Sequence, residues 1–223
     1  MGIWNWILHL LFPPKCLLCR KVLRDEELDL CETCRLNSPE CTNFRKKFPF
    51  IDSWTAVWYY EDSARCSLLR YKFRHARSYA QGYGRLLAMR LLEANADGFD
   101  LLTWVPVSPL RKFFRGYDQV ELLAQWVGQE LGTEPVPLLK KIRHNRTQSR
   151  IIGDAKRRAN VLGAYWVENP ELIQGKRIIL LDDIITSGAT AGECARVLLT
   201  AGAKEVHCGA VAVKRYRANN KVR

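Results

Sequence analysis

The sequence predicts an α/β protein in which helices cover a mainly parallel sheet, preceded by a small module built around four cysteines. Three observations support this fold class. Apolar runs that suit buried strands alternate along the chain with stretches of helical periodicity. One apolar run begins at Arg177 and ends in two adjacent carboxylates, which a hydroxyl-rich turn follows. Four of the eight cysteines fall in two Cys-x-x-Cys pairs near the N-terminus.

The composition indicates a chain that can bury a full hydrophobic core. It has 223 residues, of which 48% are hydrophobic, enough for one sizeable α/β domain and a small satellite. We expect the N-terminal segment and the cysteine module to occupy residues 1–45, and the main domain residues 46–223. The net charge of +12 favours polyanionic partners, namely nucleic acid, phosphorylated substrates or an anionic membrane surface.

The first twelve residues are apolar and contain Trp4 and Trp6. They lack a basic leader region and a small-residue cleavage site, and they are too short to span a bilayer. One interpretation is a short helix that packs on the body of the protein. The other is a weak anchor at a membrane surface, with the two tryptophans at the interface. We expect a cytoplasmic protein without a transmembrane segment.

The paired cysteines are Cys16 with Cys19 and Cys31 with Cys34, separated by a gap of eleven residues. This spacing predicts a zinc ribbon in which each pair lies on a knuckle turn and four thiolates bind one structural Zn²⁺ at about 2.3 Å. Redox chemistry at one pair is the alternative, but a thioredoxin-like βαβ context is missing. The remaining four cysteines are scattered, which suits a reducing compartment.

The main domain is predicted to begin with a strand, because residues 51–60 are rich in Val, Trp and Tyr. Helical spacing then predicts helices over 61–75, 79–95 and about 117–131, with a strand over 101–107 between the last two. Shorter strands are expected at 134–139 and 161–167. A helix over 190–200, ended by Gly202, and a closing strand over 205–213 complete the pattern.

Residues 177–190 have the layout of a phosphate-binding strand, loop and helix. Loop amides and a helix N-terminus favour an anion, and Asp182 and Asp183 can hold sugar hydroxyls or a divalent cation. The segment is not a Walker loop, since no Gly-Lys-Ser/Thr follows, nor is it a GxGxxG fingerprint.

Two basic stretches are further candidates for anion binding. The cluster at residues 70–77, which includes Lys72, either contacts phosphate or is a solvated helix face. Residues 140–158 carry eight basic side chains against one acid, Asp154, and either grip a nucleic-acid backbone or form a solvated loop. The nucleic-acid candidates in this second stretch are Arg143, Arg146, Arg157 and Arg158.

Residues 180–190 resemble the signature of the type I phosphoribosyltransferases, which bind phosphoribosyl pyrophosphate with Mg²⁺. The resemblance implies that Asp182 and Asp183 hold the ribose hydroxyls and that Arg111 and Arg115 receive the pyrophosphate. It also implies a mobile basic lid within residues 140–158. The 5′-phosphate would lie in the turn formed by Thr186, Ser187, Gly188, Ala189 and Thr190.

The order of motifs narrows the resemblance to the ComF/GntX family. The motifs are the four-cysteine ribbon, Val-Pro-Val-x-Pro-Leu from Val105, Arg-Gly-Tyr-Asp-Gln from Arg115 and Asp-Asp-x-x-Thr-Ser-Gly-Ala-Thr from Asp182. Members of this family are linked to DNA uptake in natural transformation and carry a phosphoribosyltransferase-like domain. The resemblance implies single-stranded DNA and a helicase-like ATPase as partners.

Two functions follow from these patterns. The first is a binding protein that keeps a phosphoribosyl pyrophosphate pocket and uses its basic surface and zinc ribbon in DNA uptake. The second is an active phosphoribosyltransferase on an unidentified nucleobase-like acceptor. Many purine-using relatives have an aspartate where this chain has Thr186, so the catalytic residue stays unassigned. Catalysis at the zinc is disfavoured, because four cysteines leave no open coordination position.

Overall fold

The main sheet consists of four parallel strands in the order β1-β6-β5-β2. The computed structural model describes residues 13–43, 46–74, 76–94, 98–143 and 154–216. The strands are β1 (Ser53–Tyr59), β2 (Leu101–Trp104), β5 (Arg177–Ile185) and β6 (Glu205–Val213). This arrangement confirms the predicted α/β fold with a parallel sheet.

The two central strands, β5 and β6, are buried along most of their length, as expected for strands that helices cover on both sides. The predicted bounds of β6 match the structure. Strand β5 was expected to end at its two carboxylates, but it continues through them to Ile185. Asp182 pairs with Ala210 and Ile185 with Val213, so the neighbouring strand β6 extends the ladder past the acidic pair.

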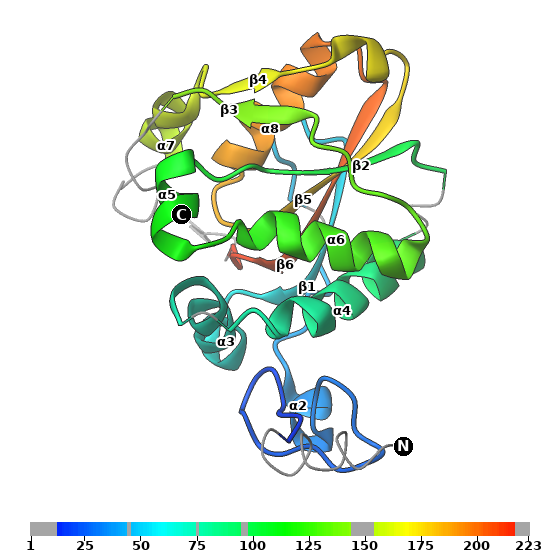
Figure 1. The fold of residues 1–223 in the computed structure, drawn as a ribbon, viewed down its shortest axis with the longest axis vertical. Helices are drawn as coiled ribbons and strands as arrows, with labels where there is room; N and C mark the ends of the chain where they lie inside the picture. The colour runs from blue at the N-terminus through cyan, green and yellow to red at the C-terminus, as the bar shows by residue number, and fades with distance from the viewer. Residues whose placement is uncertain (1–12, 44–45, 75, 95–97, 144–153, 217–223) are drawn as a thin grey trace, which may run out of the picture.

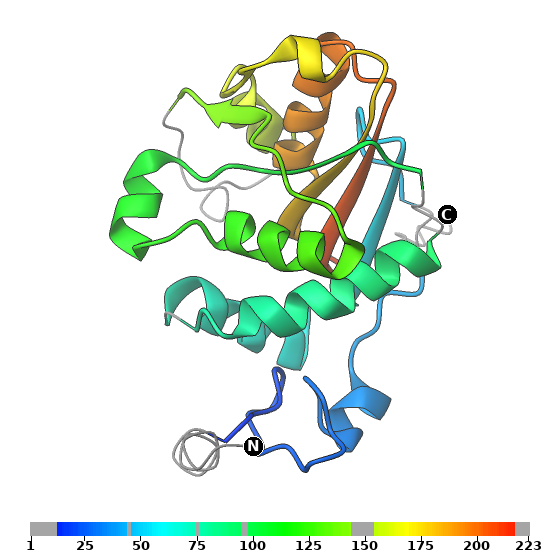
Figure 2. The same ribbon diagram turned by 45° about the vertical axis from the view of Figure 1, so that its right-hand side comes forward.

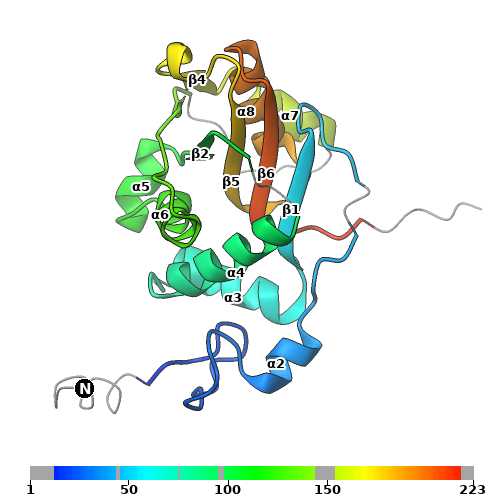
Figure 3. The ribbon, with the colours of Figure 1, turned by 90° about the vertical axis from the view of Figure 1, so that its right-hand side faces the viewer.

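Helices pack on both faces of the sheet. One hydrophobic core joins one face to α3 (Asp62–Phe73), α4 (Tyr79–Glu93) and α6 (Gln119–Leu131). The other face packs against α8 (Ala189–Thr200), which in turn contacts α7 (Asp154–Val161). Figure 3 shows α5 and α6 on one side of the sheet and α7 on the other. All the predicted long helices are thus present.

A second, two-stranded sheet lies at the top of the molecule in Figure 1. It pairs β3 (Leu139–Lys141) with β4 (Tyr165–Val167) in antiparallel fashion. The strand predicted over 134–139 was misplaced, since Pro135 and Pro137 lack the amide that a ladder needs. The strand predicted from residue 161 begins later, because α7 extends to Val161.

Two α-helices of the main domain were not predicted. Residues 109–115, expected as a loop, form α5 (Pro109–Arg115), with proline in its first turn. Residues 154–158, expected as the end of a basic flap, belong to α7. A short 3-10 helix, η2 (Pro170–Leu172), follows β4.

The cysteine module lies at the end of the molecule opposite β3 and β4, beneath α3 and α4 (Figures 1 and 2). It contains the short helix α2 (Glu32–Asn37). Leu17 and Leu18 are buried in the same core as α3 and α4, and Arg85 of α4 forms two hydrogen bonds of 2.8 and 2.6 Å with Asp29. The module therefore packs firmly on the helical face of the main domain.

Some predictions concern residues outside the described ranges. They include the apolar segment 1–12 and Arg146. The boundary placed at residue 45 stays a prediction. Within the described part of the chain, no helix has both the length and the apolar character that crossing a membrane requires.

Candidate functional site

The topology of the sheet has a switch point between β2 and β5. These strands are parallel neighbours, so their carboxyl ends meet at one edge. The chain leaves β2 towards α6 on one face and leaves β5 into α8 on the other face. In open α/β sheets, ligands bind where the connections diverge in this way.

Asp182 and Asp183 lie at this edge, and both are buried. The amide of Asp183 donates to Oδ1 of Asp182 at 2.8 Å. Lys72 Nζ is 2.8 Å from Oδ1 of Asp183, and Gln119 Nε2 donates to Oδ2 of Asp183 at 3.2 Å. The structure therefore brings the predicted acidic pair together and supplies a cation for one of its members.

Burial raises the pKa of Asp182 to about 8, and the neighbouring charge of Asp183 acts in the same direction. Lys72 and the amide of Asp183 oppose this effect but do not outweigh it. The Asp182 carboxyl therefore holds its proton to a higher pH than an ordinary aspartate does, and in that form it offers a hydrogen-bond donor as well as an acceptor.

The turn after β5 has the shape of an anion-binding loop. Thr186, Ser187 and Gly188 precede α8, so their backbone leads directly into a helix N-terminus. Gly188 has a φ of +75°, and an added Cβ would lie only 2.2 Å from the Phe48 ring. The site therefore requires glycine at this position.

Two further contacts hold the loop in place. Ser187 Oγ accepts a hydrogen bond of 3.4 Å from the amide of Ala189, the first residue of α8. The hydroxyl of Tyr216 donates to the carbonyl of Thr186. The side chains of Thr186 and Thr190 are half-buried at this edge. All five predicted loop residues thus lie together, next to the acidic pair.

The segment after β2 carries the predicted pyrophosphate ligands. Arg111 and Arg115 belong to α5, but their side chains lie outside the described part of the structure. Helix α5 ends at Gly116, whose φ of +72° is left-handed and whose carbonyl accepts a 2.9 Å hydrogen bond from Arg77. The Arg77 guanidinium also lies 4.6 Å from the centre of the Tyr117 ring. Arg77, from the basic cluster at residues 70–77, thus stabilises the segment after β2.

Asp118 ties the same segment to the start of α6. Its Oδ1 accepts from the amides of Val120 and Glu121, as an N-cap does, and its Oδ2 accepts from the amide of Val107 at 3.0 Å. Burial raises the pKa of Asp118, and the three amides partly compensate. The carboxylate therefore fixes where the chain leaves the end of β2.

The described nucleic-acid candidates gather around α7. Arg143, just after β3, donates to the carbonyl of Asn160 at 3.5 Å, which places it against the helix that carries Arg157 and Arg158. Trp166 of β4 is 62% exposed and pairs across the strands with Lys140. Arg158 also borders a cavity of about 200 Å³ at the start of α8.

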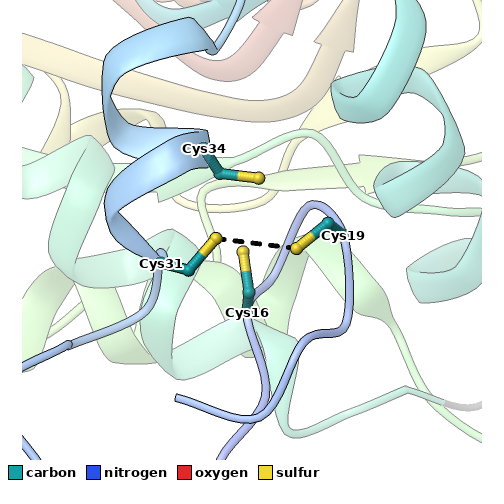
Figure 4. Close-up of side chains that lie close together, drawn as sticks. All are labelled: Cys16, Cys19, Cys31 and Cys34. Atoms are coloured by element: carbon teal, nitrogen blue, oxygen red, sulfur yellow. Dashed lines mark hydrogen bonds between the residues drawn. The ribbon is translucent and has the colours of Figure 1, made fainter. Parts of the chain in front are cut away.

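The four paired cysteines converge as predicted. Their sulfur atoms all lie within 4.8 Å of one another, and the Sγ atoms of Cys19 and Cys31 are 3.6 Å apart (Figure 4). Four sulfurs at tetrahedral zinc distances would be separated by about 3.8 Å, so the donor set fits Zn²⁺. The first pair lies on a turn as expected, but the second opens α2 instead of a second knuckle. Cys41 is buried outside this cluster.

The thiols differ in acidity. Burial opposes ionisation of Cys16, but the amides of Cys19, Cys31 and Leu18 together lower its pKa to about 7. Burial and the neighbouring thiols raise the pKa of Cys34. A bound cation would favour the thiolate at every position, so the cluster is suited to a metal ion.

Residues 121–222 match the sequence family described as the phosphoribosyl transferase domain. With the parallel sheet, the acidic pair and the glycine turn, this match indicates a phosphoribosyltransferase-type fold for the main domain. The allosteric regulatory enzyme of purine biosynthesis and the glutamine phosphoribosylpyrophosphate amidotransferase of B. subtilis are similar solved structures, each 22% identical with a TM-score of 0.42. Those matches cover 64% and 63% of this chain but only 29% and 30% of the longer chains.

Similarity to curated proteins is more extensive. The chain is 24% identical to competence protein F of Haemophilus influenzae, over 86% of this chain and 93% of that protein. It is 28% identical to competence protein ComFC of Streptococcus pneumoniae and to DNA utilization protein YhgH of Escherichia coli K12. Those two matches also cover 86% of this chain, with 96% of ComFC and 86% of YhgH. Over most of its length the chain is thus similar to competence and DNA utilization proteins of the ComF type.

Sequence reasoning missed several residues that build the site. Lys72 was noted only as a member of a basic cluster and Gln119 only as the end of the Arg-Gly-Tyr-Asp-Gln motif, and Phe48 and Tyr216 were not considered as site residues. Their partners lie on distant segments of the chain, so no local pattern marks them. The one signal in the sequence was the basic side chain of Lys72, near the end of the helix predicted over 61–75.

Proposed function

We propose that this chain binds phosphoribosyl pyrophosphate, with Mg²⁺, at the switch point between β2 and β5. The observation that supports this most is the meeting of three features at one sheet edge. They are a buried acidic pair, a turn that requires glycine at position 188, and the segment that carries Arg111 and Arg115.

Each chemical part of the ligand has a matching group. The turn 186–190 would take the 5′-phosphate, since amides at a helix N-terminus favour an anion. Asp182 and Asp183 would hold the ribose hydroxyls, and Arg111 and Arg115 would pair with the pyrophosphate. Mg²⁺ would supply positive charge that offsets the negative charge of the pyrophosphate.

Binding is better supported than transfer. A transferase needs a group that accepts the proton which the acceptor substrate loses. Thr186 offers a hydroxyl at the position where purine-using relatives have a carboxylate. Asp182 holds its proton by burial, which suits hydrogen bonding to a sugar diol. Transfer to an unidentified nucleobase-like acceptor is the alternative function.

Calorimetry with Mg²⁺ and phosphoribosyl pyrophosphate tests the ligand. The double variant Asp182→Asn, Asp183→Asn should abolish binding. A control with Asp25→Asn and Glu26→Gln removes two exposed carboxylates from the cysteine module and should bind like the wild type. Undiminished binding by the first variant would show that the ligand assignment is wrong. Pyrophosphate release in the presence of nucleobases or single-stranded DNA would instead favour the transferase.

We further propose a cytoplasmic role in DNA uptake, in which the chain holds single-stranded DNA and acts beside a helicase-like ATPase. The names of the relatives support the process, and the net charge of +12 suits a polyanion. The surface around α7 offers arginines for phosphates and the exposed ring of Trp166 for stacking on a base.

Single-strand binding at several salt concentrations tests this surface. Replacing Arg143, Arg157 and Arg158 by Gln should weaken binding and reduce the salt slope by about 2, since each phosphate contact contributes about 0.7. The matched control replaces Arg65, Lys176 and Lys204, which are exposed elsewhere. Equal slopes for the two variants would exclude the α7 surface.

A further inference from the structure

Side chains of helix α3 contact both the cysteine module and the acidic pair. Figure 1 shows α3 between the module and the main sheet. Arg70 and Lys72 are two residues apart on this helix, and at about 100° per residue their side chains leave it in nearly opposite directions. One reaches the module and the other reaches Asp183.

Arg70 holds the first cysteine turn by its backbone. Its Nη2 donates to the carbonyls of Leu17 and Leu18 at 3.0 and 2.7 Å, and these residues lie between Cys16 and Cys19. The buried hydroxyl of Ser67, one turn earlier on α3, also donates to the Leu17 carbonyl. These hydrogen bonds therefore fix α3 relative to the turn that carries Cys16 and Cys19.

Two contacts then run from the end of α3 to Asp183. Lys72 reaches Asp183 directly at 2.8 Å, with only 19% of its side chain exposed. The hydroxyl of Tyr71 donates to the carbonyl of Gln119 at 2.5 Å, and the Gln119 side chain donates to the other oxygen of Asp183. Both oxygens of Asp183 are thus held by groups whose positions depend on α3.

We propose that Lys72 is a positioning residue of the phosphoribosyl pyrophosphate site, and that the four-cysteine module sets its place through Arg70. Lys72 fixes the Asp183 carboxylate and supplies a positive charge beside it. The module thereby acts as a structural support of the ligand site at the far side of α3. This inference rests on the proposed ligand and assigns the module a role in binding affinity as well as in folding.

The first test measures affinity for Mg²⁺ and phosphoribosyl pyrophosphate by calorimetry on the full-length protein. We expect Lys72→Met and Arg70→Gln each to weaken binding at least tenfold. The double variant should bind no more weakly than Lys72→Met alone, because Arg70 acts through Lys72. Lys72→Arg, which keeps the charge, should recover most of the affinity.

Controls separate positioning from loss of structure. Arg65→Met removes a charge from the exposed side of the same helix and should bind like the wild type. Arg70→Gln leaves all four cysteines in place and should retain its metal, measured by elemental analysis. Additive losses in the double variant, or normal binding by Arg70→Gln, would overturn the proposal.

A second test does not depend on the ligand. A double-mutant cycle with Lys72→Met and Asp183→Asn measures the coupling of these residues in the free energy of unfolding. That coupling should fall by at least half when the cycle is repeated in the Arg70→Gln background. An unchanged coupling would refute the path through Arg70. A wild-type protein that binds no phosphoribosyl pyrophosphate would refute the ligand, and the cycle would still decide the path.

Discussion

Replacing Asp182 by Asn should stabilise the folded protein, and the gain should grow with pH. Asp182 is buried at the end of β5, and burial beside Asp183 raises its pKa from 3.8 to about 8. Asparagine keeps an oxygen for the amide of Asp183 and resembles the protonated carboxyl in shape. It removes the cost of keeping a carboxylic acid protonated.

The size of the effect follows from the pKa. A tenfold change in an acid dissociation constant is worth about 1.4 kcal/mol, so this change in pKa corresponds to at most about 6 kcal/mol. Rearrangement of Lys72 and entry of water would reduce that value. We therefore expect a gain of about 2–3 kcal/mol at pH 8 relative to pH 5.

The direction with pH follows from proton linkage. Below the unfolded pKa near 3.8, the carboxyl is protonated in both states and Asp182 imposes no penalty. Between that value and about 8, the unfolded chain releases the proton while the folded protein keeps it, so wild-type stability falls. Above about 8 the difference between wild type and variant should level off.

Urea unfolding at intervals from pH 5 to pH 9, with zinc present, would measure this. Glu205→Gln, an exposed carboxyl at the start of β6, is the control and should show no comparable trend. If Asp182→Asn shows the same difference from wild type at every pH, the reasoning about the buried acid is wrong.

Other variants test the loop, the helix cap and the metal. Gly188→Ala should lower the free energy of unfolding by about 2–3 kcal/mol, through a left-handed φ and a clash with Phe48; the paired variant with Phe48→Ala should recover part of this in chemical denaturation. Asp118→Ala should cost about 1–2 kcal/mol through its lost N-cap, and Asp118→Asn less, by the same measurement. Elemental analysis should find about one zinc per chain, and Cys31→Ser should lower both metal content and the thermal midpoint. Metal-free wild type of equal thermal stability would contradict the last prediction.

Local patterns were sufficient to predict much of the framework. The apolar run of β6 and the helical spacing of α8 predicted their extents to within a residue. The cysteine spacing predicted the cluster, because four ligands on so short a segment have few other arrangements. These features depend on residues that are close together in the sequence, so local patterns are enough to predict them.

The contacts that complete the site depend on tertiary structure. Lys72 meets Asp183, and Phe48 covers Gly188, only after the sheet has assembled. The helix α5 was missed because its residues lie between a strand and a strongly periodic helix, where a loop was the simpler expectation. Prolines 135 and 137 were given too little weight when β3 was placed.

The bond from Tyr216 to the Thr186 carbonyl has a practical consequence for anyone preparing this protein. Residues 214–216 follow β6; Arg215 pairs with Glu61 at 2.9 Å, and Tyr216 reaches the turn after β5. Trimming the chain before Tyr216, by protease or by choice of expression boundary, would remove the hydroxyl that hydrogen-bonds to the turn after β5. Ligand affinities measured on such shortened protein would understate those of the intact chain.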